Sequence, residues 1–92
     1  MITPTKFRQS PDVVYDRIGE EAVLVHMVTN QIYELNRTGA RLWELLCAGY
    51  DRRQTQQLML QEFDVPESDL AVEIEAMLSS LKEAGLITEV KR

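Results

Sequence analysis

The segment QIYELNRTGARLWELL, Gln31–Leu46, decides the fold, because it passes from strand spacing to helix spacing within a few residues. Its first part, Gln31–Asn36, alternates polar and apolar side chains, as a strand with one buried face does. After a short polar hinge, apolar residues recur at helical spacing, and either Asn36 or Thr38 can cap the helix. The sequence therefore predicts a strand at Gln31–Asn36 that leads directly into a helix ending near Ala48.

Two further helices are predicted downstream of this segment. Asp51 is a good N-terminal cap, and it opens a second helix that runs to about Glu62. The stretch FDVPESD then breaks the helical pattern at Pro66, since proline cannot continue a helix. A third helix covers about Asp69–Ala84 and stops at Gly85.

The third predicted helix has two distinct faces when residues are spaced at about 100°. The apolar stripe, which we expect in the core, is Leu70, Ile74, Met77, Leu78 and Leu81. The adjacent flank has small side chains and two acids near its start: Asp69, Glu73, Ala76, Ser80 and Ala84. This flank either leaves room for a partner to lie against the helix or is an ordinary exposed face of good helix formers.

Two strands precede the opening segment, and a short strand follows the helices. Val13–Ile18 and Ala22–Met27 have the β-branched and apolar content of strands, with Gly19 at the turn between them. Leu86–Val90 can form a closing strand, and residues 1–11 lack an apolar period, so we expect a loose N-terminal arm. The predicted fold class is α+β: a three-stranded antiparallel β-meander, with Ala22–Met27 in the middle, followed by three α-helices.

Composition limits the partners and the compartment. The chain has 92 residues, of which 45% are hydrophobic, and a formal net charge of −5, which indicates one small acidic domain. A nucleic-acid binder needs clustered Lys and Arg, and the ten here are scattered. No signal peptide and no apolar run of roughly 20 residues is visible, so we expect a cytoplasmic protein without a membrane span. The single cysteine, Cys47, cannot form an internal disulfide and is expected to be a small core side chain.

Residue patterns that indicate catalysis are scarce. His26, the only histidine, falls inside a predicted strand, no Cys/His spacing fits a metal site, and no glycine-rich loop fits a phosphate. We therefore expect no enzymatic activity, no cofactor and no metal. An edge of the meander is a better candidate site, because its unpaired backbone groups can pair with an extended peptide. Gln31–Asn36 is such an edge, unless the arm or the closing strand covers it.

Three stretches of the chain resemble a known family. They are EEAVLVHM (Glu20–Met27), IYELNRTGARLWELL (Ile32–Leu46) and FDVPESDLAVEIEAMLSSLKEAGLI (Phe63–Ile87). The likeness extends over about residues 12–88 and is to the PqqD-like domains, or RiPP recognition elements, which bind leader peptides of ribosomally made, modified peptides. The resemblance implies a winged-helix-like fold, with an arm at residues 1–11 and a peptide-binding domain at residues 12–90.

The resemblance also implies how a leader peptide binds. The leader adds antiparallel to the third strand and lies between that strand and the third helix. The strand residues are Gln31, Ile32, Tyr33, Glu34 and Leu35. The helix residues, which rest on the periodicity as well, are Asp69, Val72, Glu73, Ala76, Met77 and Ser80. The acids among them favour basic leader side chains, and by analogy lasso leaders carry a Tyr and a Pro a few residues apart.

Within the family, the chain is most similar to the stand-alone leader-binding proteins of lasso-peptide biosynthesis. That similarity implies a separate leader peptidase, a cysteine protease, and a macrolactam-closing cyclase as partners. HMVTNQ, residues 26–31, stands where PqqD proper usually has a YPEG-like stretch, which argues against a role in PQQ synthesis. A PqqD-type peptide chaperone for a radical-SAM enzyme is the alternative. A winged-helix DNA binder, which the acidic third helix disfavours, and a structural subunit of a larger enzyme are the remaining alternatives.

Overall fold

The computed structural model describes residues 6–90, which form five strands and three helices. In chain order these are β1 (Lys6–Gln9), β2 (Val13–Ile18), β3 (Glu21–His26), β4 (Gln31–Leu35), α1 (Arg37–Cys47), α2 (Arg52–Glu62), α3 (Glu67–Glu83) and β5 (Ile87–Val90). β2, β3 and β4 form an antiparallel sheet with β3 in the middle, and β1 and β5 pair in a separate antiparallel sheet. The meander and the three helices confirm the predicted fold class.

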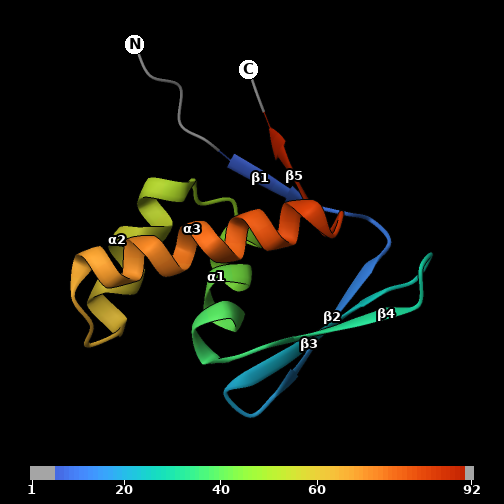
Figure 1. The fold of residues 1–92 in the computed structure, drawn as a ribbon, viewed down its shortest axis with the longest axis horizontal. Helices are drawn as coiled ribbons and strands as arrows, with labels where there is room; N and C mark the ends of the chain where they lie inside the picture. Colours follow the sequence, from blue (N-terminus) through green and yellow to red (C-terminus); the bar gives the residue numbers. More distant parts are fainter. Residues whose placement is uncertain (1–5, 91–92) are drawn as a thin grey trace.

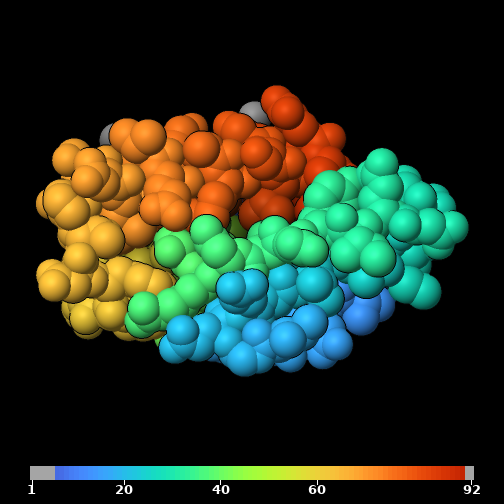
Figure 2. Space-filling model, turned by 60° about the horizontal axis from the view of Figure 1, so that its bottom comes forward, coloured from blue at the N-terminus to red at the C-terminus, as the bar shows by residue number. Residues whose placement is uncertain are grey.

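The helices are layered beside the meander. α3 crosses the molecule from α2 toward β5, and the meander lies on the other side of α1 (Figure 1). Figure 2 shows the same layering on the surface, where α1 (green) lies between the strands (blue to teal) and α3 (orange to red). α1 is therefore the central element, in contact with both sheets and with both other helices.

The helix starts follow from their capping residues. Asn36 is the cap of α1, and its side chain accepts a hydrogen bond from the Gly39 backbone N–H at 2.8 Å. Asp51 caps α2 in a capping box, in which its side chain accepts from the Gln54 N–H while the Gln54 side chain accepts from the Asp51 N–H. β4 ends at Leu35, one residue earlier than the alternation predicts, because Asn36 serves the helix instead.

The core lies between the helices and the inner face of the meander. α1 contributes Leu42, Trp43, Leu45 and Leu46, and α3 contributes Leu70, Ile74, Leu78 and Leu81. The Tyr15 ring of β2 stacks on Trp43, with 6.4 Å between ring centroids and 17° between planes. The sequence also places Met77 in this core, but Met77 is only half-buried. It packs against the margin of the core, beside Gly39 at the start of α1.

A polar network joins β2 to α1. The Glu44 carboxylate accepts hydrogen bonds from Tyr15 Oη at 2.7 Å and from Arg17 Nη1 at 2.5 Å. Arg41 Nη1 donates to the same carboxylate at 3.2 Å. The bond from Tyr15, followed by those from the two arginines, holds the pKa of Glu44 below its usual value. Burial and the neighbouring Glu44 raise the pKa of Tyr15 to about 12.

The N-terminal region differs from the sequence prediction. The sequence predicts a loose arm over residues 1–11, whereas Lys6–Gln9 form β1 and pair with β5, and residues 1–5 lie outside the described range. Phe7 is the apolar residue of β1, and its side chain is buried in the core. A four-residue strand with one apolar residue has no recognisable period, and its partner lies at the other end of the chain.

The prediction that Cys47 is a core residue is wrong. Cys47 is exposed at the end of α1, and its Sγ donates a hydrogen bond to Gln9 Oε1 at 2.9 Å. Neighbouring groups nevertheless desolvate the thiol and raise its pKa to about 11. The helical spacing places Cys47 beside the core stripe, but α1 ends there.

Candidate functional site

The β4 edge of the meander is open. β4 pairs with β3 along one side, and no other strand within residues 6–90 pairs with its second side. β1 and β5 pair with each other, so neither covers β4. The outer backbone N–H and C=O groups of β4 are therefore available to an added strand.

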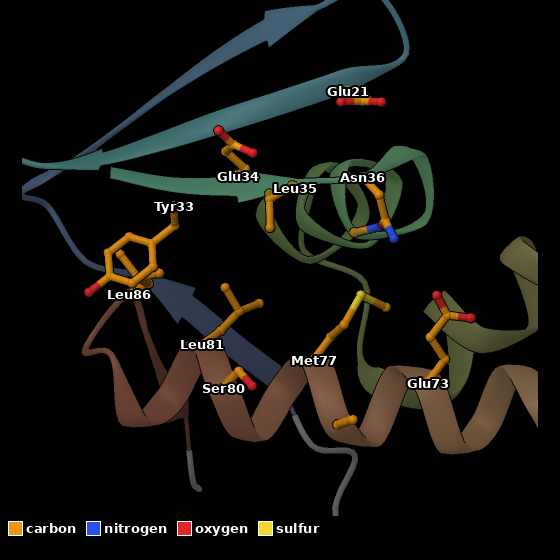
Figure 3. A pocket seen from close by; sticks show the side chains of 12 residues that line it. Glu21, Tyr33, Glu34, Leu35, Asn36, Glu73, Met77, Ser80, Leu81 and Leu86 are labelled. Atoms are coloured by element: carbon orange, nitrogen blue, oxygen red, sulfur yellow. The ribbon is translucent and has the colours of Figure 1, made fainter. Parts of the chain in front are cut away.

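A groove of about 510 Å³ lies beside this edge, between β4 and α3. The residues that line it are Glu21, Tyr33, Glu34, Leu35, Asn36, Gly39, Glu73, Ala76, Met77, Ser80, Leu81 and Leu86. Tyr33 and Leu35 point from β4 toward α3, where Met77 and Leu81 face them (Figure 3). The site thus combines an unpaired strand edge with a helical wall and a mostly apolar floor.

The two walls of the groove run in opposite directions. Tyr33 lies near Leu86 at one end of the groove, and Asn36 and Glu73 lie at the other end (Figure 3). Increasing residue number along β4 therefore corresponds to decreasing residue number along α3. The two ends differ in chemistry, since the first is aromatic and aliphatic and the second carries an amide and a carboxylate.

Gly39 allows the start of α1 to approach both walls. A Cβ atom at this position would lie 3.4 Å from Met77 Sδ and 3.5 Å from Leu35 Cβ. These are ordinary van der Waals distances, so the Cβ of an alanine would be in contact with both walls and would fill the space that the glycine leaves. The glycine of the hinge therefore has a steric role at the floor of the groove.

The structure brings together most of the predicted site residues. Those that line the groove are Tyr33, Glu34, Leu35, Glu73, Ala76, Met77 and Ser80. Ile32 does not, because it pairs with Val25 on the outer face of the sheet and is 67% exposed. Gln31 begins β4 and its side chain accepts a hydrogen bond from the Tyr33 hydroxyl. Asp69 and Val72 are exposed on α3 but lie outside the groove lining.

Five groove residues were not predicted as site residues. They are Glu21, Asn36, Gly39, Leu81 and Leu86. Asn36 and Gly39 belong to the polar stretch between the predicted strand and helix, and Leu81 to the predicted core stripe. Their positions were foreseeable, but the sequence does not show that they line a groove. Glu21 and Leu86 have no sequence signal, because they reach the site only through tertiary packing.

The groove lining is acidic. Glu21, Glu34 and Glu73 contribute carboxylates, and no lysine, arginine or histidine occurs among the described residues that line it. Within residues 6–90 no group of His, Cys, Asp and Glu side chains is placed to hold a metal ion. The lining therefore offers apolar contacts, backbone hydrogen bonds and negative charge to an occupant.

The meander, the three helices and the open edge of β4 together are those of a PqqD-like domain. The chain belongs to this family: the model of coenzyme PQQ synthesis protein D (PqqD) matches residues 21–87. No curated protein matches the sequence. The predicted family is therefore confirmed.

Two solved structures are similar over nearly their whole length. TbiB1 in complex with the TbiA(beta) leader peptide matches with a TM-score of 0.83 and 25% identity, over 92% of this chain and 99% of that one. A lasso peptide synthetase B1 complexed with the leader peptide matches with a TM-score of 0.81 and 26% identity, over 90% and 98%. This chain is thus similar in fold to two B1 proteins that were solved with leader peptides.

Proposed function

We propose that this chain is a leader-peptide-binding protein, a RiPP recognition element, that acts in lasso-peptide biosynthesis. The observation that supports this most directly is the groove of about 510 Å³ beside the unpaired edge of β4. The two similar B1 structures, each in complex with a leader peptide, add to it. The leader binds as an added antiparallel strand on β4, with side chains in the groove.

In this proposal the chain performs no bond chemistry. It holds a leader that is disordered when free and presents the precursor to a separate leader peptidase, a cysteine protease, and to a cyclase. The leader loses conformational entropy on docking. Backbone hydrogen bonds to β4 and apolar contacts with Tyr33, Leu35 and Met77, the half-buried apolar residues of the lining, offset that loss. The benefit to the peptidase is a raised effective concentration of its substrate.

In the same proposal, the predicted site residues outside the groove also contact the leader. Side chains of an added strand alternate between the two faces of the sheet. Those on the outer face lie beside Ile32 and Glu34, and those on the inner face enter the groove. Asp69 and Val72 extend the helical wall beyond the acidic end, where a longer leader continues.

Blocking the groove tests the proposal. Ala76 is exposed on α3 and lines the groove. Ala76→Trp fills the space with an indole, so the Kd for the leader peptide of the cognate precursor should rise at least about tenfold. Fluorescence anisotropy with the labelled leader measures this, and circular dichroism checks the fold.

Ser79→Trp is the matched control, because Ser79 is small and exposed on the same helix but does not line the groove. Its Kd should stay within about twofold of the unsubstituted chain, a change of about 0.4 kcal/mol. Equal affinities for all three proteins would refute the placement of the leader between β4 and α3.

A PqqD-type peptide chaperone for a radical-SAM enzyme is the second candidate, and the match to the PqqD family model favours it. The two candidates share the groove and differ in the enzyme that uses the bound leader. In the lasso proposal, adding this chain accelerates leader removal by its partner leader peptidase. Acceleration of a radical-SAM modification, with no effect on the peptidase, would decide for the second candidate.

A further inference from the structure

Among the described residues, no lysine, arginine or histidine forms an ion pair with the carboxylates of the groove. Elsewhere, Glu44, Glu62, Glu75 and Glu89 each form an ion pair with an arginine or a lysine. None of the three glutamates in the lining forms one within residues 6–90. An occupant of the groove therefore meets carboxylates that no ion pair within residues 6–90 neutralises.

The arginine nearest in sequence to the acidic end does not neutralise it. Arg37 follows Asn36 directly, but its guanidinium lies 4.8 Å above the centre of the Phe63 ring. This cation–π contact places the guanidinium at Phe63, the C-cap of α2, and neither residue lines the groove. Arg37 forms no ion pair with a carboxylate of the groove within residues 6–90.

The negative charge is concentrated at one end. Glu73 and Glu21 lie on the side of Asn36, where β4 ends and α1 begins (Figure 3). The opposite end, around Tyr33 and Leu86, is apolar. Glu34 lies between them, with its side chain directed away from α3 (Figure 3). A peptide in the groove thus experiences a gradient from apolar to acidic surroundings.

Because an added strand has a fixed direction, this gradient predicts a preference for the order of residues in the bound peptide. A strand antiparallel to β4 has its N-terminal part beside Leu35 and its C-terminal part beside Gln31. Its N-terminal residues therefore pass the carboxylates, and the residues that follow enter the apolar end.

We infer, on the basis of the proposed function, that the groove selects leaders in which Lys or Arg lies N-terminal to the apolar residues anchored near Tyr33. Exposed ion pairs are each worth about 0–1 kcal/mol, so one pair changes Kd by up to about fivefold. The apolar anchor contributes affinity, and the charge sets which leaders are preferred and in which direction they lie.

A selection from random peptides tests the inference and does not require the natural leader. The probe is a phage-displayed library of random peptides of about 12 residues, long enough to extend past β4 at both ends. Peptides that bind the unsubstituted chain but not Ala76→Trp are those captured by the groove. Enriched sequences should carry Lys or Arg on the N-terminal side of an aromatic or aliphatic residue.

The outcomes separate the inference from the proposed function. Enriched peptides without a charge bias, or with the basic residues C-terminal to the anchor, overturn the inference and leave peptide binding intact. Failure to enrich any peptide that depends on the groove counts against the proposed function itself.

A charge reversal provides the second arm. Glu73→Lys places a cation at the acidic end, and Kd for an enriched basic peptide should rise about fivefold at low ionic strength. Glu83→Lys makes the same charge change at an exposed residue of α3 that does not line the groove, and should leave Kd within about twofold. The difference should disappear near 1 M salt, where the Debye length is about 3 Å. Equal effects of the two variants would overturn the inference.

Discussion

Tyr15 and Tyr33 occupy equivalent positions at the two edges of the meander, since both pair with Leu24 of the middle strand. The Tyr15 ring stacks on Trp43, and its hydroxyl donates to Glu44. The Tyr33 ring lines the groove, and its hydroxyl donates to Gln31 of its own strand. One residue type in one row of the sheet therefore stabilises the fold at one edge and faces open space at the other.

The difference shows what makes an edge strand available for binding. Both β2 and β4 have an unpaired backbone edge within residues 6–90. Side chains of β2 already contact α1: Tyr15 stacks on Trp43, and Tyr15 and Arg17 donate hydrogen bonds to Glu44. Those of β4 face α3 across a gap. An edge therefore becomes a binding site when its side chains, and not only its backbone, lack a partner.

Removing the Tyr15 ring, at the β2 edge, should have the largest effect on stability. We expect Tyr15→Ala to lower the free energy of unfolding by about 2–3 kcal/mol, because the variant loses the stack on Trp43 and leaves space in the core. Urea denaturation measures this. The folded fraction should bind the leader with unchanged affinity, and a large loss of affinity in the folded protein would contradict the assignment of this edge to the fold alone.

The matched change at the open edge should affect binding more than stability. We expect Tyr33→Ala to raise the Kd for the leader about tenfold, or about 1.4 kcal/mol, since the variant removes an aromatic wall of the groove. The free energy of unfolding should fall by at most about 1 kcal/mol, because Tyr33 has neither the ring stack nor the bond to α1 that Tyr15 has. Anisotropy and urea denaturation on the same preparation separate the two effects. A loss of stability equal to that of Tyr15→Ala would remove the contrast between the edges.

The smallest expected effect is the pH dependence of the stability that Glu44 provides at the β2 edge. The folded pKa of Glu44 is lowered, chiefly by the Tyr15 hydroxyl, so its stabilising contribution is fully present above the unfolded pKa near 4.5. That contribution is lost as the pH falls through the lower folded value. Glu44→Gln should therefore cost about 1 kcal/mol at neutral pH and less as the pH falls below 4.5. Urea denaturation across this range checks the slope, and a constant difference between variant and parent would exclude the ionised carboxylate as the cause.

The sequence predicted the features that depend on local physics. Asn36 and Asp51 cap helices because their side chains bond to backbone groups a few residues away. The stripe of Leu70 and Ile74 is buried because helical periodicity alone places both on one face. These are consequences of neighbouring residues, so one sequence suffices to find them.

The features that the sequence did not predict depend on distant pairing. β1 needs its partner β5 from the other end of the chain, and Leu86 reaches the groove only because β5 lies beside α3. Ile32 and Tyr33 both fit an edge strand, but only the packing of α3 decides which of them faces a groove. The strand and the wall of the site were therefore predictable as elements, whereas the exact lining was not.

Gly39 implies a compromise between helix stability and the depth of the groove. An alanine in the interior of a helix is favoured over glycine by about 0.8–1.0 kcal/mol. Its methyl group would lie in van der Waals contact with Met77 Sδ and Leu35 Cβ, and would fill space at the floor of the groove. The chain thus forgoes a more rigid first turn of α1 and keeps a deeper channel for its occupant. A homologue that carries a larger residue here would have a shallower channel, suited to smaller anchoring side chains.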